Sequence, residues 1–456
     1  MTGQRTDLVG IRPSRLHKID ATALLTLYLF FLIAIPSRLQ YSPLGGAGSP
    51  TTILGALFLL WYIFCWLHPS SRLDTGPQPM RRAAVLFLCT ILATYVSATQ
   101  HYLPSLELNG ADRGLILTCG WVGVLLLAAD GIDSAERLRT LLRRVVFGVT
   151  SMAALGIVQF RTGLNAANYI LIPGLSINQP YTDLLARGDF RRPSATAIHP
   201  LEFGFVLAAV LPLAIHQARY APPGLRVRRW LQVALIAVAL PMTVSRSAFV
   251  GLAIGLIVIL PTWPRRDRWV AYVVMICGLF ALRAVIPGLI GTIRNLFLSS
   301  SSDSSAQERS AAFTHAGPLI SAHPWFGQGF GTFIPHTLFF TDDQFLNSAI
   351  EIGLVGLAVL LVLFLTGWRL ARRTRRASSD PETRHLAQCL AASAAVMAAG
   401  YTTFDAFYFP MAAALTFFLL GCVGAAWRLL PSEADGVVRF GGTAMSHLLA
   451  LARAGD

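Results

Sequence analysis

The stretch Trp230–Leu260, WLQVALIAVALPMTVSRSAFVGLAIGLIVIL, decides the topology of the chain, and its single charged side chain is Arg246. As one helix it would extend about 46 Å at 1.5 Å per residue, which exceeds the roughly 30 Å hydrocarbon core of a bilayer. Pro241 and Ser245 supply a natural break in the helix. We therefore predict two short membrane-spanning helices with Arg246 at the tip, where an ionisable side chain is a functional candidate.

Ten further apolar runs flank this hairpin, and each approaches the roughly 20 apolar residues that a spanning helix needs. Only 13% of the 456 residues are charged, whereas soluble proteins have about 25%. The predicted fold class is all-α: a polytopic membrane protein of about twelve transmembrane helices, the first of them not a cleaved signal peptide. The ten runs are Ala21–Ile35, Thr51–Leu67, Ala83–Thr99, Gly114–Ala129, Leu141–Phe160, Leu201–His216, Trp269–Ile286, Phe345–Trp368, Leu386–Phe404 and Pro410–Trp427.

Basic residues concentrate in every second connection and in both tails, and cytoplasmic segments carry such an excess of Lys and Arg. The predicted domains are a cytoplasmic N-terminal tail (1–20), a transmembrane domain (21–430) and a cytoplasmic C-terminal tail (431–456). The net charge of +14 follows this alternation, so we expect no nucleic-acid partner. The six cysteines fall in apolar spans, where no pair has metal-ligand spacing, and we predict neither a disulfide framework nor a metal site.

Two outer loops are long, 161–199 and 287–343, and the second is one large loop between predicted helices 9 and 10. Long loops on a compact scaffold often carry function. Because both loops and Arg246 fall on the same side, we place the candidate chemistry at the outer face.

The first long loop ends in Arg187-Gly-Asp-Phe-Arg191-Arg192, followed by His199 and Glu202. Arginine makes bidentate contacts to phosphate, so the arginine cluster is a candidate phosphate site. Lipid-headgroup anchoring or packing is the structural alternative, and a single histidine such as His199 is more often structural than catalytic.

The second long loop carries Arg309, His323 and the pair Asp342-Asp343, and Glu351 follows about two turns into the next helix. Paired carboxylates can bind a cation, bind sugar hydroxyls or act as a general base. A helix N-cap is the structural alternative for one of the two aspartates. Glu351 is expected to need a partner in the apolar span, such as an outer arginine.

Four motifs in this order resemble the O-antigen ligase/polymerase superfamily of bacterial envelopes, and the topology extends the resemblance over about residues 20–430. The individual motifs are loose, whereas four of them in order on one side are fairly specific. They are Arg192–Pro200 (RPSATAIHP), Thr243–Leu252 (TVSRSAFVGL), His323–Phe333 (HPWFGQGFGTF) and Asp342–Leu357 (DDQFLNSAIEIGLVGL).

The resemblance implies a metal-independent glycosyltransferase without a cofactor, in the bacterial cytoplasmic (inner) membrane with its active face outward. It implies transfer of a glycan from a polyprenyl-diphosphate carrier to a glycan or lipid acceptor, among membrane lipids and envelope-assembly partner proteins. Arg191 or Arg192 and Arg246 match the family's phosphate-binding arginines, and Asp342 or Asp343 stands at the position of the base. Supporting roles are expected for His199, Glu202, Arg309, His323 and Glu351.

The ligases have a His-Asn pair where this chain has Asp342-Asp343, and the Asp-bearing variant is similar to the exopolysaccharide polymerase branch. The choice between polymerase and ligase stays open, as does His336 as an alternative base. A lipid-linked oligosaccharide flippase or polysaccharide exporter is the transport alternative; it predicts charges along a path through the membrane and internal repeats. A polyprenyl-phosphate-sugar transferase with an acidic first outer loop is disfavoured, because 36–50 contains no Asp or Glu.

Overall fold

The computed structural model describes residues 20–67, 76–100, 102–177, 184–187, 189–298, 304–334 and 338–430. Helices dominate these residues, which confirms the all-α prediction. The predicted tails lie outside the described residues except for Asp20. In chain order the helices are α1 (Ala21–Ala34), α2 (Pro50–Leu67), α3 (Pro79–Thr99), α4 (Ser105–Gly131), α5 (Ala135–Thr162), α6 (Pro200–Arg219), α7 (Arg226–Met242), α8 (Arg246–Ile259), α9 (Arg265–Val285), α10 (Leu289–Leu298), α11 (Ser304–Ala322), α12 (Gln344–Glu351), α13 (Gly353–Ala377), α14 (Pro381–Gly400) and α15 (Pro410–Arg428).

Strand structure in the described part of the chain is confined to two short antiparallel pairs. β1 (Leu39–Gln40) pairs with β2 (Ser176–Ile177), and β3 (Ala186–Arg187) pairs with β4 (Phe190–Arg191). The β1–β2 pair joins the connection after α1 to the predicted loop 161–199. The β3–β4 pair brings Arg191 and Arg192 to the end of a tight hairpin.

Eight helices of the described residues are long and apolar enough to cross a membrane: α2 to α6, α9, α13 and α15. The two shorter apolar helices are α1 and the segment Arg246–Thr262, which begins with α8. With α7 and α14, these helices correspond to the twelve predicted spans. The chain is therefore a polytopic helical membrane protein.

The stretch 230–260 forms the predicted hairpin. α7 ends at Met242, and α8 begins at Arg246 with Ser245 as its N-cap residue. Val244 between them has a φ of 47°, a left-handed conformation that turns the chain sharply. Arg246 therefore lies at the tip of the hairpin, as predicted.

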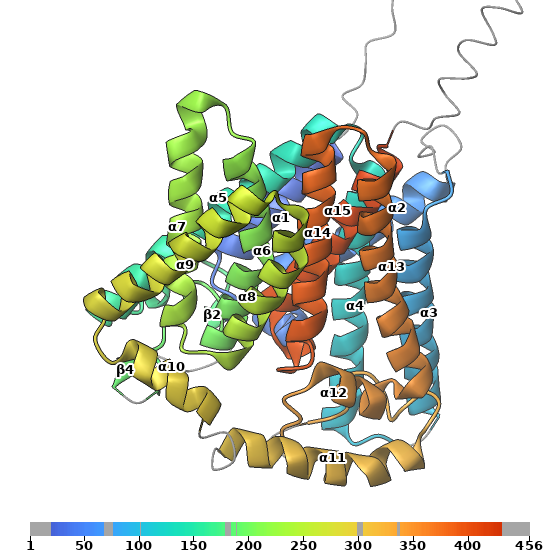
Figure 1. Cartoon of the computed structure of the whole chain (residues 1–456). Helices are drawn as coiled ribbons and strands as arrows, with labels where there is room; N and C mark the ends of the chain where they lie inside the picture. The colour runs from blue at the N-terminus through green and yellow to red at the C-terminus, as the bar shows by residue number, and fades with distance from the viewer. Residues whose placement is uncertain are drawn as a thin grey trace, which may run out of the picture.

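Both ends of the described chain lie at one face of the bundle, which we call the terminal face. Arg137 at the start of α5 forms an ion pair with Asp20 at 2.7 Å, and Arg428 at the end of α15 donates to Ala129 O at 3.1 Å. The opposite loop face carries the described residues of 163–199 and α10 to α12, and Figure 1 shows α11 lying across it. An even number of membrane-spanning segments places both ends of the described chain at the same face.

Close backbone contacts hold α4 against α2. A Cβ at Gly55 would collide with Gly120, and a Cβ at Gly123 would collide with Gly55 and Leu59. Small residues let membrane helices approach closely and pack over a large area. α4 therefore forms part of the core and holds its loop-face end in a fixed position.

The predicted span Phe345–Trp368 is wrong as a single helix, because the chain breaks between α12 and α13. Gly353 has a φ of 67°, in the left-handed region that favours glycine. The glycine-rich turn after α11 packs into this break, where Gly329 N donates to Glu351 O at 2.9 Å and Leu354 N donates to Pro324 O at 2.8 Å. The large predicted loop is also mostly helical, since it contains α10 and α11.

Candidate functional site

A cavity of about 1020 Å³ opens at the loop face, and we call it the large cavity. Its walls come from the loop-face end of α4, from segments 42–47, 331–334, 340–342 and 404–409, and from the start of α6. Pockets for drug-sized ligands usually measure about 300–1,000 Å³, so this cavity is large enough for an oligosaccharide. Its ionisable lining residues are Asp112, Arg113, His199, Asp342, Asp405 and Tyr408.

The two predicted aspartates occupy different environments. Asp343 is the N-cap of α12, and its Oδ1 accepts hydrogen bonds from Phe345 N at 2.8 Å and Leu346 N at 3.1 Å. Asp342 lines the large cavity and has a φ of 47°. Backbone strain of this kind persists where the surroundings enforce it, often at functional sites. Asp342 is thus the aspartate of the pair that faces a substrate-sized space.

Asp405 is a carboxylate beside this pair that the predicted site does not include. Its Oδ1 accepts hydrogen bonds from Thr341 Oγ1 at 2.5 Å and from Asp343 N at 3.2 Å. Burial raises the pKa of Asp405 to about 6; the hydrogen bond from Thr341 opposes this shift, and the negative charge of Asp342 adds to it. Two neighbouring carboxylates, Asp342 and Asp405, therefore line the same cavity, and the charge of Asp342 acts on Asp405.

Glu351 holds the glycine-rich turn under the cavity. Its Oε1 accepts from Gly331 N at 3.0 Å and lies 3.4 Å from the Tyr408 hydroxyl. Burial raises the pKa of Glu351 to about 8. Arg113 of α4 interacts electrostatically with Glu351 and also lines the large cavity.

Arg192 lies in a second, smaller pocket of about 30 Å³, the arginine pocket, which Arg38 also lines. The Arg192 side chain is buried, and its Nε donates to Thr243 O at 2.9 Å. Its Nη2 has no hydrogen-bond partner among the described residues. Burial and the charge of Arg187 lower the pKa of Arg192 to about 10, so it stays a cation at neutral pH.

The arginine pocket adjoins the large cavity, because Ile198 lines both. Arg192 also connects the loop before α6 to the tip of the α7–α8 hairpin, three residues before Arg246. A buried guanidinium with a free N–H at the edge of a substrate-sized cavity is suited to bind an anion.

Two predicted supporting residues organise the start of α6. His199 is its N-cap: its Nδ1 accepts from Leu201 N at 3.1 Å, and its ring lines the large cavity. Burial and then the charge of Arg192 lower the pKa of His199 to about 4, so it is neutral at pH 7. Glu202 is fully buried and accepts from Ile198 N and Met411 N, which fixes α6 against α15.

The remaining predicted residues lie outside the linings of these two pockets. Arg191 is exposed and packs on Gly163 at the end of α5, and Arg246 begins α8. His323 is exposed just after α11. Arg309 lies in α11, and its side chain is outside the described part of the structure, as is His336.

Sequence reasoning missed Arg113 and Asp405. Arg113 directly precedes the apolar run Gly114–Ala129 at its predicted outer end, where the charge rule does not favour an arginine. That position was the available signal for Arg113. Asp405 is separated from Asp342 by two membrane spans, and its proximity to Asp342 depends on tertiary packing.

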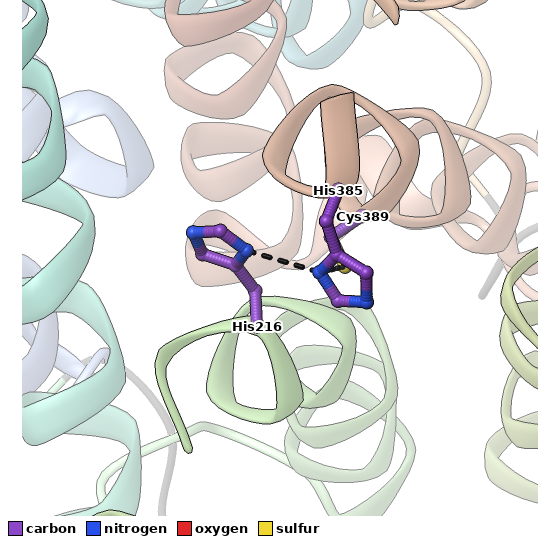
Figure 2. Close-up of side chains that lie close together, drawn as sticks. All are labelled: His216, His385 and Cys389. Carbon is purple, nitrogen blue, oxygen red and sulfur yellow. Dashed lines mark hydrogen bonds between the residues drawn. The ribbon is translucent and has the colours of Figure 1, made fainter. Parts of the chain in front are cut away.

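A separate cluster at the terminal face joins His216, His385 and Cys389, whose donor atoms lie within 4.8 Å of one another. Figure 2 shows the two rings facing each other, with their Nδ1 atoms 3.0 Å apart. Trp263 Nε1 donates to His385 Nε2 at 3.0 Å. Since an indole only donates, His385 carries its proton on Nδ1 and donates it to His216. A metal on His385 Nδ1 would shift that proton toward Trp263, so the hydrogen bonds favour a neutral histidine pair.

The O-antigen ligase family model matches residues 231–361 of the chain. The match begins in α7, ends in α13 and includes Arg246, Arg309, His323, Asp342–Asp343 and Glu351. The chain matches no curated protein at a significant level. Residues 231–361 are therefore similar to the O-antigen ligase family, which confirms the resemblance of this membrane protein to the O-antigen ligase/polymerase superfamily.

Proposed function

We propose that the chain transfers a glycan from a polyprenyl-diphosphate carrier to an acceptor bound in the large cavity. The observation that carries this proposal is the pairing of two features at one face. A cavity lined by Asp342 and Asp405 adjoins a pocket with the buried cation Arg192. The family match supports a role in envelope polysaccharide synthesis, and the proposal places this face on the outer side of the inner membrane.

Arg192 and Arg246 are proposed to hold the diphosphate of the donor. The Nη2 of Arg192 is free to donate, and Arg246 is held near it because Arg192 Nε binds Thr243 in the same hairpin. Negative charge grows on the diphosphate as the glycosidic bond breaks. Fixed cationic donors in a site of low dielectric stabilise such charge without reorganising.

Asp342 is proposed to act as the general base. The acceptor hydroxyl loses its proton to the Asp342 carboxylate while its oxygen forms a bond to the anomeric carbon. The carbon–oxygen bond to the diphosphate breaks, and the polyprenyl diphosphate leaves with the electron pair. A positioned base of this kind contributes about 10²–10⁴-fold in rate.

Asp343 and Asp405 are proposed as positioning residues. Asp343 fixes the start of α12 through its N-cap hydrogen bonds. Asp405 holds the 341–343 turn, and its negative charge makes Asp342 more basic. Arg113 is proposed to contact acceptor hydroxyls across the cavity.

A transfer assay on the purified protein tests this function. The donor is a polyprenyl-diphosphate oligosaccharide, and EDTA is present throughout. Extension of lipid-linked chains without added acceptor would indicate a polymerase, and transfer only after a candidate acceptor is added would indicate a ligase. If neither occurs while liposomes containing the protein move the lipid-linked glycan between leaflets, the transport alternative replaces this proposal.

A further inference from the structure

A third pocket, of about 140 Å³, opens at the terminal face between α5, α6 and α7, and we call it the α5–α7 pocket. Its basic lining residues are Arg139, Arg143 and Arg229. The pocket is far from the loop-face site, and the proposed transfer reaction makes no use of it.

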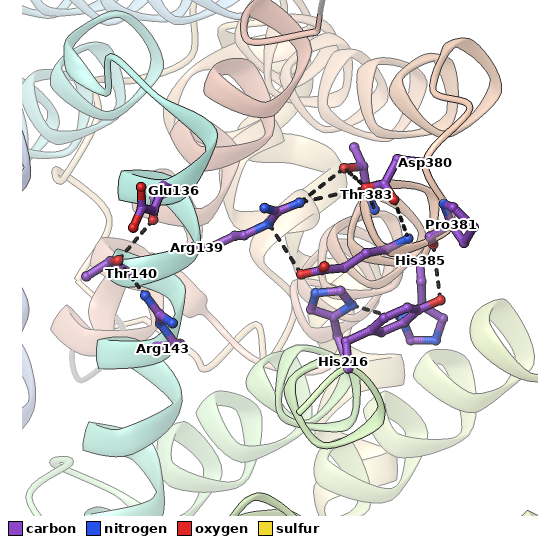
Figure 3. Close-up of polar contacts among 11 residues, drawn as sticks. Glu136, Arg139, Thr140, Arg143, His216, Asp380, Pro381, Thr383 and His385 are labelled. Atoms are coloured by element: carbon purple, nitrogen blue, oxygen red, sulfur yellow. Dashed lines mark hydrogen bonds and ion pairs between the residues drawn. The ribbon is translucent and has the colours of Figure 1, made fainter. Parts of the chain in front are cut away.

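The positive charges of this pocket are only partly balanced. Arg139 pairs with Glu382 at 3.4 Å and Asp380 at 3.8 Å. Figure 3 shows Arg139 reaching toward Asp380, whereas Arg143, one turn further along α5, contacts Thr140. Arg143 and Arg139 share one face of α5 because they are four residues apart.

Among the described residues, the hydrogen-bond partners of Arg229 are likewise neutral. Its Nη1 lies 3.0 Å from Gln232 Oε1 and 3.3 Å from Gln217 Oε1. No ion pair of Arg143 or Arg229 occurs among the described residues. These hydrogen bonds therefore orient the guanidinium groups of Arg143 and Arg229 without neutralising their charge.

The helix dipole adds to this positive potential. Arg229 lies in the first turn of α7, which contains no acidic residue. A helix N-terminus carries a partial positive charge and favours anions. The positive charge of an arginine in the first turn is therefore repelled by the helix N-terminus. A bound anion would relieve both this repulsion and the repulsion between the arginines.

Beside the polar residues His216, Gln217, Tyr220 and Glu382, the pocket has apolar lining residues, which include Leu142, Leu213, Leu225 and Leu386. An inorganic anion would gain no binding free energy from these apolar residues, whereas the glycerol and first acyl carbons of a lipid would bury their apolar surface. The pocket is also smaller than the roughly 300 Å³ of typical ligand sites, so it would admit only part of a lipid.

We propose that the α5–α7 pocket binds the phosphate of an anionic phospholipid from the surrounding leaflet, held by Arg143 and Arg229. Arginine binds phosphate oxygens through pairs of parallel N–H groups. Tyr220 and Gln217, which also line the pocket, are placed to contact the headgroup. This site is independent of the proposed glycan transfer.

Native mass spectrometry of the purified protein, titrated with phosphatidylglycerol, tests the proposal. The variant Arg143→Ala/Arg229→Ala is compared with Arg265→Ala/Arg266→Ala, which removes two exposed arginines from the same face at the start of α9. Diacylglycerol with the same acyl chains is the ligand control. We expect the first bound phosphatidylglycerol to be weakened on the order of tenfold in the pocket variant only. We expect diacylglycerol to bind weakly to all forms.

Equal loss in both double variants would overturn the proposal, because it would mean a diffuse charge effect. Equal binding of diacylglycerol and phosphatidylglycerol would also overturn it. Displacement of the lipid by millimolar inorganic phosphate, with the same dependence on Arg143 and Arg229, would assign the site to free phosphate instead. If the alanine pair does not fold, the glutamine pair at the same positions replaces it, with the same expectation.

Discussion

Replacing Asp405 by asparagine should stabilise the protein while making it less active. Burial raises the pKa of Asp405 from 3.8 to about 6. One pKa unit corresponds to about 1.4 kcal/mol, so the ionised carboxylate destabilises the fold by about 3 kcal/mol. Asparagine keeps an Oδ1 acceptor for Thr341 Oγ1 and Asp343 N. Loss of the stronger charge-assisted bonds offsets part of the gain, which leaves about 1–2 kcal/mol.

The sign of this effect depends on pH. Because the folded-state pKa is above the unfolded value, the wild-type carboxylate is unfavourable to the folded state above pH 6. That penalty falls as the pH drops below 6 and is nearly gone at about pH 4, because the folded-state side chain is then protonated and the unfolded one approaches its own pKa of 3.8. The difference in Tm between Asp405→Asn and wild type should therefore be largest above pH 6 and vanish near pH 4. Thermal unfolding of the detergent-purified protein across this range measures it.

The transfer rate of Asp405→Asn should fall on the order of tenfold, because removal of the neighbouring charge makes the proposed base Asp342 less basic. For the same reason the acidic limb of the pH–rate profile should move to lower pH. A variant with lower Tm and lower activity at every pH would show that Asp405 is only structural. Unchanged activity and an unmoved acidic limb would refute the coupling to Asp342.

The other predictions concern four residues of the loop face. Arg192→Ala and Arg192→Lys should both lower the transfer rate at least tenfold, because lysine cannot reproduce the guanidinium hydrogen bond to the hairpin. Full activity of either variant in a donor titration would contradict the phosphate-binding role. Asp343→Ala should lower the unfolding free energy by about 1 kcal/mol, and Asp343→Asn should lower it much less, as expected for an N-cap residue. Denaturant unfolding measures both differences. Gly331→Ala should lower the unfolding free energy by about 1–3 kcal/mol, because residue 331 has a φ of 86° and the added Cβ would collide with Gly110 O. The Tm of the variant protein should fall accordingly. Arg113→Ala should raise the KM for acceptor more than that for donor; the reverse ratio would place Arg113 with the diphosphate.

The apolar helices and the hairpin between α7 and α8 could be predicted from the sequence because they depend on local quantities. Apolar run length and arginine position are both visible in the chain, and the hairpin at Arg246 follows from them. The break before Gly353 could not be predicted in this way. It requires the glycine-rich turn of residues 327–331 to hydrogen-bond to the helix, and that pairing is tertiary.

The candidate site was predictable in part for the same reason. The sequence signals identified Asp342, Asp343 and Arg192 through family motifs and through charge on an unexpected side. They did not reveal that Asp343 caps a helix while Asp342 lines a cavity, because both are aspartates before an apolar run. The assignment depends on a φ of 47° at Asp342 that only the folded chain displays.

Asp20 and Leu430 both lie at the terminal face, and this has a practical consequence for experiments on immobilised protein. An affinity handle joined next to Asp20 or Leu430 would leave from the terminal face, on the opposite side from the large cavity. Protein tethered through such a handle to a sensor chip would present its loop face to the flowing solution. Binding of soluble glycan acceptors could then be followed without the support blocking their approach.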